Sequence, residues 1–112
     1  MPEGDSVNVD LNNLTVTHNE EEQLFELFVD GLRALLTYSR FPDRIVIIHT
    51  EVPQAFEGHG LAAKLSRSAL DFARLHHLRV VPLCPCVSEF IRKHPEYQDL
   101  VSSDDLQKLL TR

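Results

Sequence analysis

The residues best placed to do chemistry lie in and beside a short glycine segment in the middle of the chain. Gly58 and Gly60 follow the apolar run at 45–48, and a helix-forming stretch begins at Leu61. A strand, a glycine turn and a helix together present unpaired backbone N–H groups to an anion. Glycine also lets the backbone approach a phosphate with no Cβ in the way. The segment is therefore a candidate pyrophosphate cradle.

The two cysteines, Cys84 and Cys86, are separated only by Pro85. This spacing is too short for a zinc knuckle, and no second pair completes four ligands, so we expect no metal site. A disulfide between them would be geometrically awkward and would close almost no loop. Either thiol can still be a reactive group; the alternative for Cys84 is packing at the end of a core strand. We expect Cys86 to be a packing residue.

Two further side chains, His49 and Glu51, stand on the strand that leads to the glycines. Both are chemically able to remove a proton, directly or through water. Strand neighbours two apart share a face, so both can instead point away from the cradle and serve at the surface. Lys64, Arg67 and Lys93 can contact a phosphate by charge. The alternative for the first two is that they belong to an exposed helix face.

The composition indicates one globular domain. The chain has 112 residues, of which 43% are hydrophobic and 25% charged, as in ordinary single domains. We expect residues 1–12 to be a flexible lead-in and residues 13–112 to form the domain. The net charge of −6 argues against a nucleic-acid partner, because phosphate contacts come from lysine and arginine. No apolar run approaches the ~18–20 residues of a membrane span, and the start lacks a secretory signal pattern, so we expect no membrane contact and a cytoplasmic location.

Hydrophobic patterning predicts the elements around the glycine segment. The stretch 23–39 fits either a helix, by its i, i+3, i+4 spacing, or a hairpin that turns at Asp30-Gly31. Periodicity slightly favours the helix, whereas a glycine inside a helix costs about 1 kcal/mol. The strand at 45–52 is apolar on both faces and should be central, and a crossover makes the strand at 78–83 parallel to it. The other expected elements are a strand at 14–17 and helices at 61–75, 87–94 and 104–110, the last capped by Asp104.

Five short blocks occur in one order and at one spacing along nearly the whole chain. They lie at 49–53, 58–62, 69–73, 81–85 and 92–97 and read HTEVP, GHGLA, ALDFA, VPLCP and RKHPEY. Over about residues 14–100 the chain resembles the compact, stand-alone branch of the GNAT superfamily of acetyl-CoA-dependent N-acetyltransferases. The resemblance implies an α/β fold with a mixed, mostly antiparallel sheet that is split between two parallel central strands, with helices packed on it. It also implies that 23–39 is a hairpin.

The resemblance assigns the binding of acetyl-CoA to particular positions. Backbone groups of Thr50, Glu51 and Val52 would pair with the pantetheine arm, which behaves like an added strand. Lys93 and His94 fall in a terminal block that lies alongside the cofactor, and Lys64 would meet its 3′-phosphate. The pyrophosphate would lie on the backbone N–H groups of Glu57, Gly58, His59, Gly60, Leu61 and Ala62.

The resemblance also suggests catalytic roles. Cys84 matches a cysteine near the acetyl thioester that has been suggested as a nucleophile and could attack the thioester to form an acyl-enzyme; the alternative is simple proximity to the thioester. Tyr97 would protonate the departing thiolate, with a structural tyrosine as the alternative. His49 and Glu51 remain the candidates for removing a proton from the amine.

An N-acetyltransferase is thus the function that the resemblance implies, with an amine acceptor and an oligomeric state that the sequence leaves open. A non-catalytic module that binds CoA or a partner is the alternative. A generic phosphate binder is a third possibility, but the chain lacks the ending of a P-loop and the spacing of a dinucleotide fingerprint.

Two features depart from the superfamily. Ala55 stands where most members have Gln or Arg, and the chain has no room for the helices that build the acceptor pocket in larger members.

Overall fold

The computed structural model describes residues 11–111. Of the predicted lead-in, residues 1–10 lie outside this part, and the remainder begins the first 3₁₀ turn. The 3₁₀ turns within these residues are η2 (Leu11–Asn13), η3 (Gln54–Phe56) and η4 (Pro95–Leu100). The strands are β1 (Thr17–Asn19), β2 (Leu24–Val29), β3 (Leu32–Arg40), β4 (Arg44–Glu51) and β5 (Arg79–Pro82), and the helices are α1 (Leu61–Leu75), α2 (Pro85–Lys93) and α3 (Ser103–Leu110).

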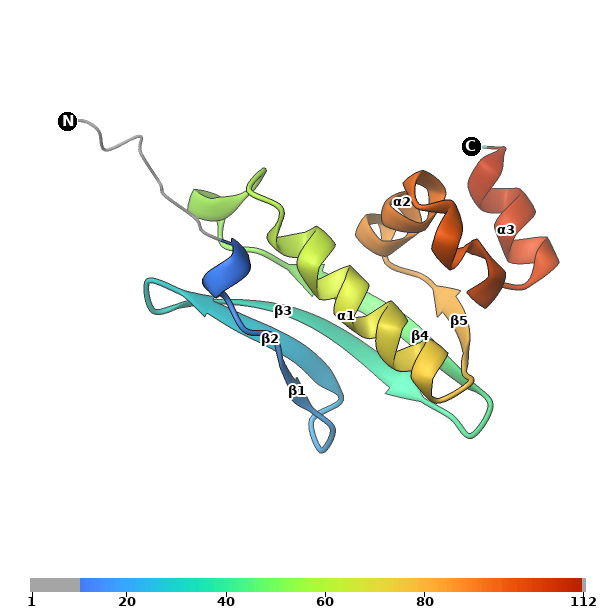
Figure 1. The fold of residues 1–112 in the computed structure, drawn as a ribbon, viewed down its shortest axis with the longest axis horizontal. Helices are drawn as coiled ribbons and strands as arrows, with labels where there is room; N and C mark the ends of the chain where they lie inside the picture. The colour runs from blue at the N-terminus through green and yellow to red at the C-terminus, as the bar shows by residue number, and fades with distance from the viewer. Residues whose placement is uncertain (1–10, 112) are drawn as a thin grey trace.

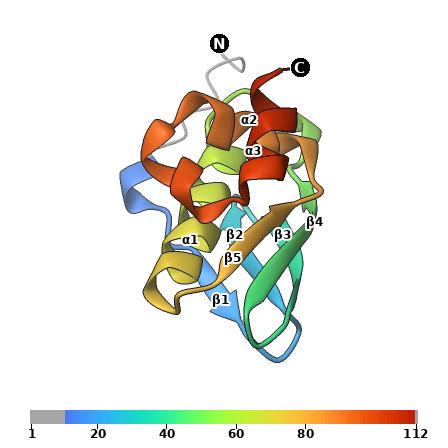
Figure 2. The ribbon, with the colours of Figure 1, turned by 90° about the vertical axis from the view of Figure 1, so that its right-hand side faces the viewer.

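The five strands form one sheet in the order β1-β2-β3-β4-β5, antiparallel throughout except for the parallel pair β4 and β5. The predicted mixed, mostly antiparallel α/β fold is therefore confirmed. All three helices lie on one side of the sheet, with α1 running across it (Figures 1 and 2). The prediction that both parallel strands are central is wrong for β5. Within residues 11–111, β5 is the last full strand, and only an isolated bridge between Val80 and Val101 lies beyond it.

The stretch 23–39 is a hairpin, as the resemblance implied and against the helical periodicity. Asp30 and Gly31 have φ of 50° and 79°, the left-handed values that a type I′ turn requires at both central positions. The pattern mimicked a helix because both faces of the hairpin carry apolar residues. Leu24 and Leu35 on the outer face are each only 9% exposed.

Strand β1 lies later in the chain than predicted, at residues 17–19 rather than 14–17. His18, which follows the predicted strand directly, lies at the centre of β1 and pairs with Phe25. Its ring stacks on the Phe25 ring at 4.1 Å, and its Nε2 shares a hydrogen bond with the Tyr38 hydroxyl. Packing of the aromatic rings therefore outweighs the low strand propensity of these polar residues.

Helix α1 spans the predicted 61–75 and holds the core together. Leu65, Ala69, Leu70 and Ala73 are fully buried on its inner stripe, and the helix packs against β2, β3, β4 and β5. Burial of each such leucine contributes about 2 kcal/mol. This stripe fixes the start of α1 relative to the end of β4.

The other two helices begin slightly differently from prediction. Pro85 occupies the first position of α2, where its missing N–H costs nothing. Ser102, and not Asp104, caps α3: its Oγ accepts a hydrogen bond from the Asp105 N–H at 3.2 Å.

None of the helices in residues 11–111 is long and apolar enough to cross a membrane.

Candidate functional site

The sheet opens where the pairing of β4 with β5 stops. The last paired residues are Ile47 and Pro82. The N–H groups of Leu83 and Cys84 then both donate to the Ile47 carbonyl, at 3.0 and 3.2 Å. Beyond this point the chain turns into α2, whereas β4 continues over residues 48–51 with β3 as its neighbour. The other edge of β4 is therefore open for pairing.

A β-bulge determines which side chains of β4 face the helices. Neighbouring residues of β3 pair with His49 and Ile47, so Ile48 is the extra residue. Ile47 is fully buried in the core. Because the bulge shifts the alternation by one residue, Thr50 points to the helix side, while His49 and Glu51 point to the opposite face.

A cleft of about 450 Å³ lies between the end of β4 and the start of α1. Such a volume is in the range of small-molecule sites. The turn η3 and the glycine loop form one wall, and the first turn of α2 contributes one side chain. The lining residues are Thr50, Val52, Phe56, Glu57, Gly58, Gly60, Leu61, Ala62, Ala63 and Cys86.

Helix α1 begins in this cleft without a side-chain cap. Gly60 is its N-cap at φ 86°, and its first turn has no acidic residue. The first backbone bond runs from the Lys64 N–H to the Gly60 carbonyl at 3.0 Å. Of the predicted cradle, the Glu57 and His59 amides donate within the turn, to Gln54 and Phe56. The amides of the other four cradle residues have no acceptor among the described residues: Gly58, Gly60, Leu61 and Ala62.

The two thiols occupy different environments at the start of α2. Cys84 is the N-cap and is 3% exposed, and its Sγ lies 3.1 Å from the Thr50 hydroxyl. Cys86 is exposed and lines the cleft, so the expectation that it packs in the core was wrong. Protein around its sulfur raises the pKa of the Cys86 thiol by desolvation, and the adjacent Cys84 raises it further. A proline at the first helical position was the sequence signal that Cys86 would lie in an exposed first turn.

His49 and Glu51 form a pair on the outer face of the sheet. The His49 Nε2 and a Glu51 carboxylate oxygen are 3.3 Å apart, and both side chains are more than half exposed. Neither lines the cleft. The backbone of β4 thus separates this pair from the thiols and from the start of α1.

Tyr97 ties η4 to the middle of α1 and does not line the cleft. Its buried hydroxyl donates to Asp71 at 2.7 Å and accepts a hydrogen bond from Arg67 at 3.1 Å. Burial raises the pKa of Tyr97, and the bond to Asp71 raises it further. The Tyr97 hydroxyl is therefore engaged in a structural hydrogen bond to Asp71, away from the cleft.

The other two predicted residues of the terminal block are also engaged away from the cleft. The Lys93 ammonium lies 3.4 Å from the Glu89 carboxylate, on the surface of α2. The His94 ring stacks on Phe90 at 3.9 Å, and its Nδ1 lies 2.7 Å from the Phe90 carbonyl oxygen. Lys64 is half-buried on the first turn of α1, beside the uncapped amides.

Comparison with known proteins decides the family. A model for GCN5-related N-acetyl-transferases matches residues 24–100. The chain belongs to this family. This match confirms the resemblance to the GNAT superfamily that the five sequence blocks indicated.

The chain is also similar to individual proteins of this kind, two of them by sequence and one by structure. It is 35% identical to Protein NATD1 of Bos taurus over 85 residues, which are 73% of this chain and 75% of the relative. Identity to Protein NATD1 of Homo sapiens is 33%, with the same coverage. A GCN5-like protein from Staphylococcus aureus, whose solution structure was determined by NMR, superposes with a TM-score of 0.62 at 30% identity. The match covers 82% of this chain and 91% of that one.

Proposed function

We propose that the chain binds acetyl-CoA in the cleft and transfers its acetyl group to an amine. The observation that carries the proposal is the uncapped start of α1, which faces a cleft of about 450 Å³ beside the open edge of β4. Unpaired amides at a helix start attract anions, because their partial positive charge adds to that of the helix dipole. Membership in the family supplies the expected ligand.

The backbone of the cleft provides most of the binding groups in this proposal. The free amides of Gly58, Gly60, Leu61 and Ala62 hold the pyrophosphate, and the Lys64 ammonium adds charge nearby. The open edge of β4 pairs with the two amides of the pantetheine arm, as a sheet edge pairs with an added strand. This explains how a chain of net charge −6 can bind an anionic cofactor: the donors are main-chain groups.

Acetyl-CoA supplies a thioester, whose acetyl group is activated for attack by an amine. The amine must be neutral to attack. His49 and Glu51 are 3.3 Å apart on the outer face, so one can accept the ammonium proton while the other orients its partner. The acceptor therefore approaches from the sheet face opposite the helices, which they leave uncovered (Figure 2), and meets the thioester at the opening between β4 and β5.

Direct transfer is the route that we favour over an acetyl-Cys84 intermediate. The Cys84 sulfur is buried and already within hydrogen-bond distance of Thr50, whereas attack requires an accessible thiolate. Tyr97 has no part in this proposal, since its hydroxyl is bonded to Asp71. Two side chains that carry a proton line the cleft: Thr50, whose hydroxyl lies 3.1 Å from the Cys84 sulfur, and Cys86.

Titration of the ¹⁵N-labelled chain with acetyl-CoA tests the binding step. We expect saturable shifts at the amides of Gly58, Gly60 and Ala62. Gly58→Ala should weaken binding at least about tenfold, because a methyl group crowds the phosphate approach. Gly31→Ala is the matched control: both glycines have φ near 80° and open space around a new Cβ, so both substitutions carry the same backbone strain. No saturation at millimolar acetyl-CoA, or equal affinity in the two variants, would refute the cradle.

Turnover with a panel of amines and polyamines tests the transfer step. We expect Glu51→Gln to lower kcat about 10- to 100-fold with little change in acetyl-CoA affinity, since a proton acceptor typically contributes at least that much. Tight binding of acetyl-CoA without turnover on any amine would instead support a non-catalytic CoA-binding module.

A further inference from the structure

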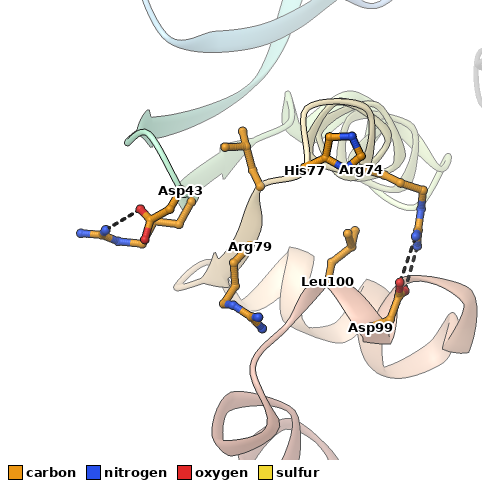
Figure 3. A pocket seen from close by; sticks show the side chains of 8 residues that line it. Asp43, Arg74, His77, Arg79, Asp99 and Leu100 are labelled. Carbon is orange, nitrogen blue, oxygen red and sulfur yellow. Dashed lines mark hydrogen bonds and ion pairs between the residues drawn. The ribbon is translucent and has the colours of Figure 1, made fainter.

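Two hollows of about 450 Å³ lie at opposite ends of β4. The hollow at the start of β4 is lined by paired charges: in Figure 3 the Arg74 guanidinium and the Asp99 carboxylate face each other, joined by two hydrogen bonds of 2.9 Å. The hollow at the end of β4 is the cleft of the proposed acetyl transfer. Among the residues that line the cleft, the ionisable side chains are Glu57 and Cys86. A free thiol therefore faces the cleft, and the transfer proposed above does not use it.

One step of the proposed transfer still lacks a group to perform it. When the C–S bond of the thioester breaks, its electron pair stays on sulfur, and the resulting thiolate takes up a proton. Tyr97, the donor that the sequence indicated, does not line the cleft, and its hydroxyl donates to Asp71. The donor is therefore another side chain that reaches the cleft, or a water molecule.

Cys86 is better suited to this step than its two neighbours. A hydroxyl such as that of Thr50 gives up its proton far less readily than a thiol. Cys84 is buried, and its sulfur lies 3.1 Å from the Thr50 hydroxyl. Cys86 is exposed and lines the cleft. Proton transfer from one thiol to another is also nearly balanced in energy, because donor and acceptor are the same chemical group.

The surroundings of Cys86 keep its proton in place. Desolvation raises the pKa of the Cys86 thiol, and the adjacent Cys84 raises it further, so the thiol is protonated at neutral pH. The other polar side chains that line the cleft are Thr50 and Glu57, whereas α1 contributes an apolar wall. Among the described residues, none that lines the cleft is a cation that would favour loss of the proton.

Cys86 and the proposed base lie on opposite sides of β4. His49 and Glu51 point to the outer face of the sheet, whereas Thr50 points to the helix side, where Cys86 lines the cleft. The opening between β4 and β5 connects the two sides, since the pairing of these strands stops at Ile47. A proton can therefore be removed from an amine on one side while another is supplied from the cleft on the other.

We infer that Cys86 is the general acid of the proposed transfer, an inference that rests on that function. The amine nitrogen forms a bond to the carbonyl carbon, and the C–S bond breaks with its electron pair going to sulfur. The Cys86 S–H proton moves to this sulfur, so that CoA leaves as a thiol. The Cys86 thiolate regains a proton from solvent, and the proton lost by the amine leaves through His49 and Glu51. The amine thus loses one proton and CoA gains one.

Disulfide exchange with CoA disulfide tests, without any turnover, whether the Cys86 sulfur reaches the sulfur of CoA. The Cys86 thiolate attacks one sulfur of the probe, a protein–CoA disulfide forms, and a CoA thiolate leaves. We expect intact-mass measurement and peptide mapping to show one CoA at Cys86. It should form at least about tenfold faster than the glutathione adduct from glutathione disulfide, because binding in the cleft positions the probe. Cys86→Ser provides the blank.

The outcomes of this exchange separate the inference from the proposed function. Equal rates for the two disulfides, or attachment at Cys84, would overturn the inference alone if acetyl-CoA still shifts the amides of the glycine loop. Equal rates without those shifts would overturn both the inference and the binding of acetyl-CoA.

Cys86→Ser also tests the step in turnover, because it keeps the size of the side chain and replaces the thiol by a much weaker acid. We expect kcat to fall at least about tenfold with the KM for acetyl-CoA unchanged, since an acid acts only in the transition state. Ser103→Cys makes the reverse exchange at an exposed residue in the first turn of α3 and should keep the parent's kcat. Full kcat in Cys86→Ser would overturn the inference, whereas a parent that acetylates no amine would overturn the proposed function with it.

The pH profile distinguishes an acid from a nucleophile. An acid works in its protonated form, so the parent's kcat should decline as the pH rises through the pKa of Cys86. Because that pKa is raised, the decline should lie above about pH 8.5, where an ordinary thiol ionises. Cys86→Ser should lose this decline. A kcat that increases over the same range, as a thiolate nucleophile requires, or a decline that Cys86→Ser retains, would contradict the role of Cys86 as an acid.

Discussion

The starts of α3 and α1 differ in whether a side chain caps their unpaired backbone N–H groups. At α3, Ser102 caps the helix and Asp104 and Asp105 place negative charge in the first turn. At α1, the N-cap is Gly60, no side chain caps the helix, and the first turn has no acid. The start of α2 resembles α1, since Cys84 makes no capping bond there. The two uncapped helices both begin beside the opening between β4 and β5.

This difference indicates where the chain forgoes stability for binding. A good cap contributes about 1 kcal/mol, and the Ser102 cap gives α3 this contribution. At α1 the amides of Gly60, Leu61 and Ala62 have no acceptor among residues 11–111, and they face a cleft. An uncapped helix start is thus informative when another helix in the same chain is fully capped.

Giving α1 the charge of α3 should have the largest effect. Ala63→Asp places a carboxylate in the first turn of α1, on an exposed residue that lines the cleft. We expect slightly higher thermal stability, by about 0.5 kcal/mol from the helix dipole. Acetyl-CoA affinity should fall roughly 100-fold, because repulsion at about 6 Å and an effective dielectric of about 20 costs about 2–3 kcal/mol. Calorimetric titration and thermal melts measure the two quantities.

Ala63→Asn is the control for this substitution, since it has nearly the same size and no charge. It should leave most of the affinity intact. Equal losses in Ala63→Asp and Ala63→Asn would mean that crowding, and not charge, governs the start of α1, and the comparison with α3 would lose its meaning.

A moderate effect is expected for the alkylation of the two thiols at the start of α2, the other uncapped helix. Cys86 is exposed and Cys84 buried, so iodoacetamide should label Cys86 first. Because its pKa is raised, its thiolate fraction at neutral pH is lower than that of free cysteine, and labelling should be correspondingly slower. The rate should increase about tenfold per pH unit below the pKa.

Acetyl-CoA should protect Cys86 from labelling, because this thiol lines the cleft. Peptide mapping by mass spectrometry identifies the labelled residue, and Cys86→Ser provides the blank. Faster labelling of Cys84, or no protection at saturating acetyl-CoA, would contradict the placement of α2 beside the cofactor.

Removing the cap of α3 should have the smallest effect. Ser102→Ala removes the bond to the Asp105 N–H and should lower the free energy of unfolding by about 1 kcal/mol. Acetyl-CoA affinity should not change. Ser103→Ala, on the exposed neighbouring residue, serves as the control in urea unfolding and should stay within about 0.5 kcal/mol of the parent. A loss of affinity in Ser102→Ala would show that α3 contributes to the cleft after all.

The parts of the fold and site that were predicted from sequence are those that neighbouring residues determine. Strand, glycine loop and helix are contiguous from 45 to 75, so their order alone implied a helix start with free amides. The α1 helix was predicted at its observed bounds, because its apolar stripe and its flanking glycine agree.

The parts that were missed depend on contacts between distant residues. β1 was misplaced because the strand position of His18 rests on Phe25 and Tyr38. The exposure of Cys86 follows from where the sheet turns into α2. Tyr97 fitted a proton donor by type and position in the chain, but its bond to Asp71 on α1 could not be seen in the sequence.

The extra residue at Ile48 has a consequence for how this chain can vary. Deleting one residue between Ile47 and Thr50 would remove the bulge and leave Thr50 on the helix side, because strict alternation then gives the directions that are observed now. Straightening the bulge without a change of length would instead exchange the two faces, so that an imidazole would face the buried sulfur and a hydroxyl would face water. This short stretch should therefore tolerate the loss of one residue better than a substitution that prevents the bulge from forming.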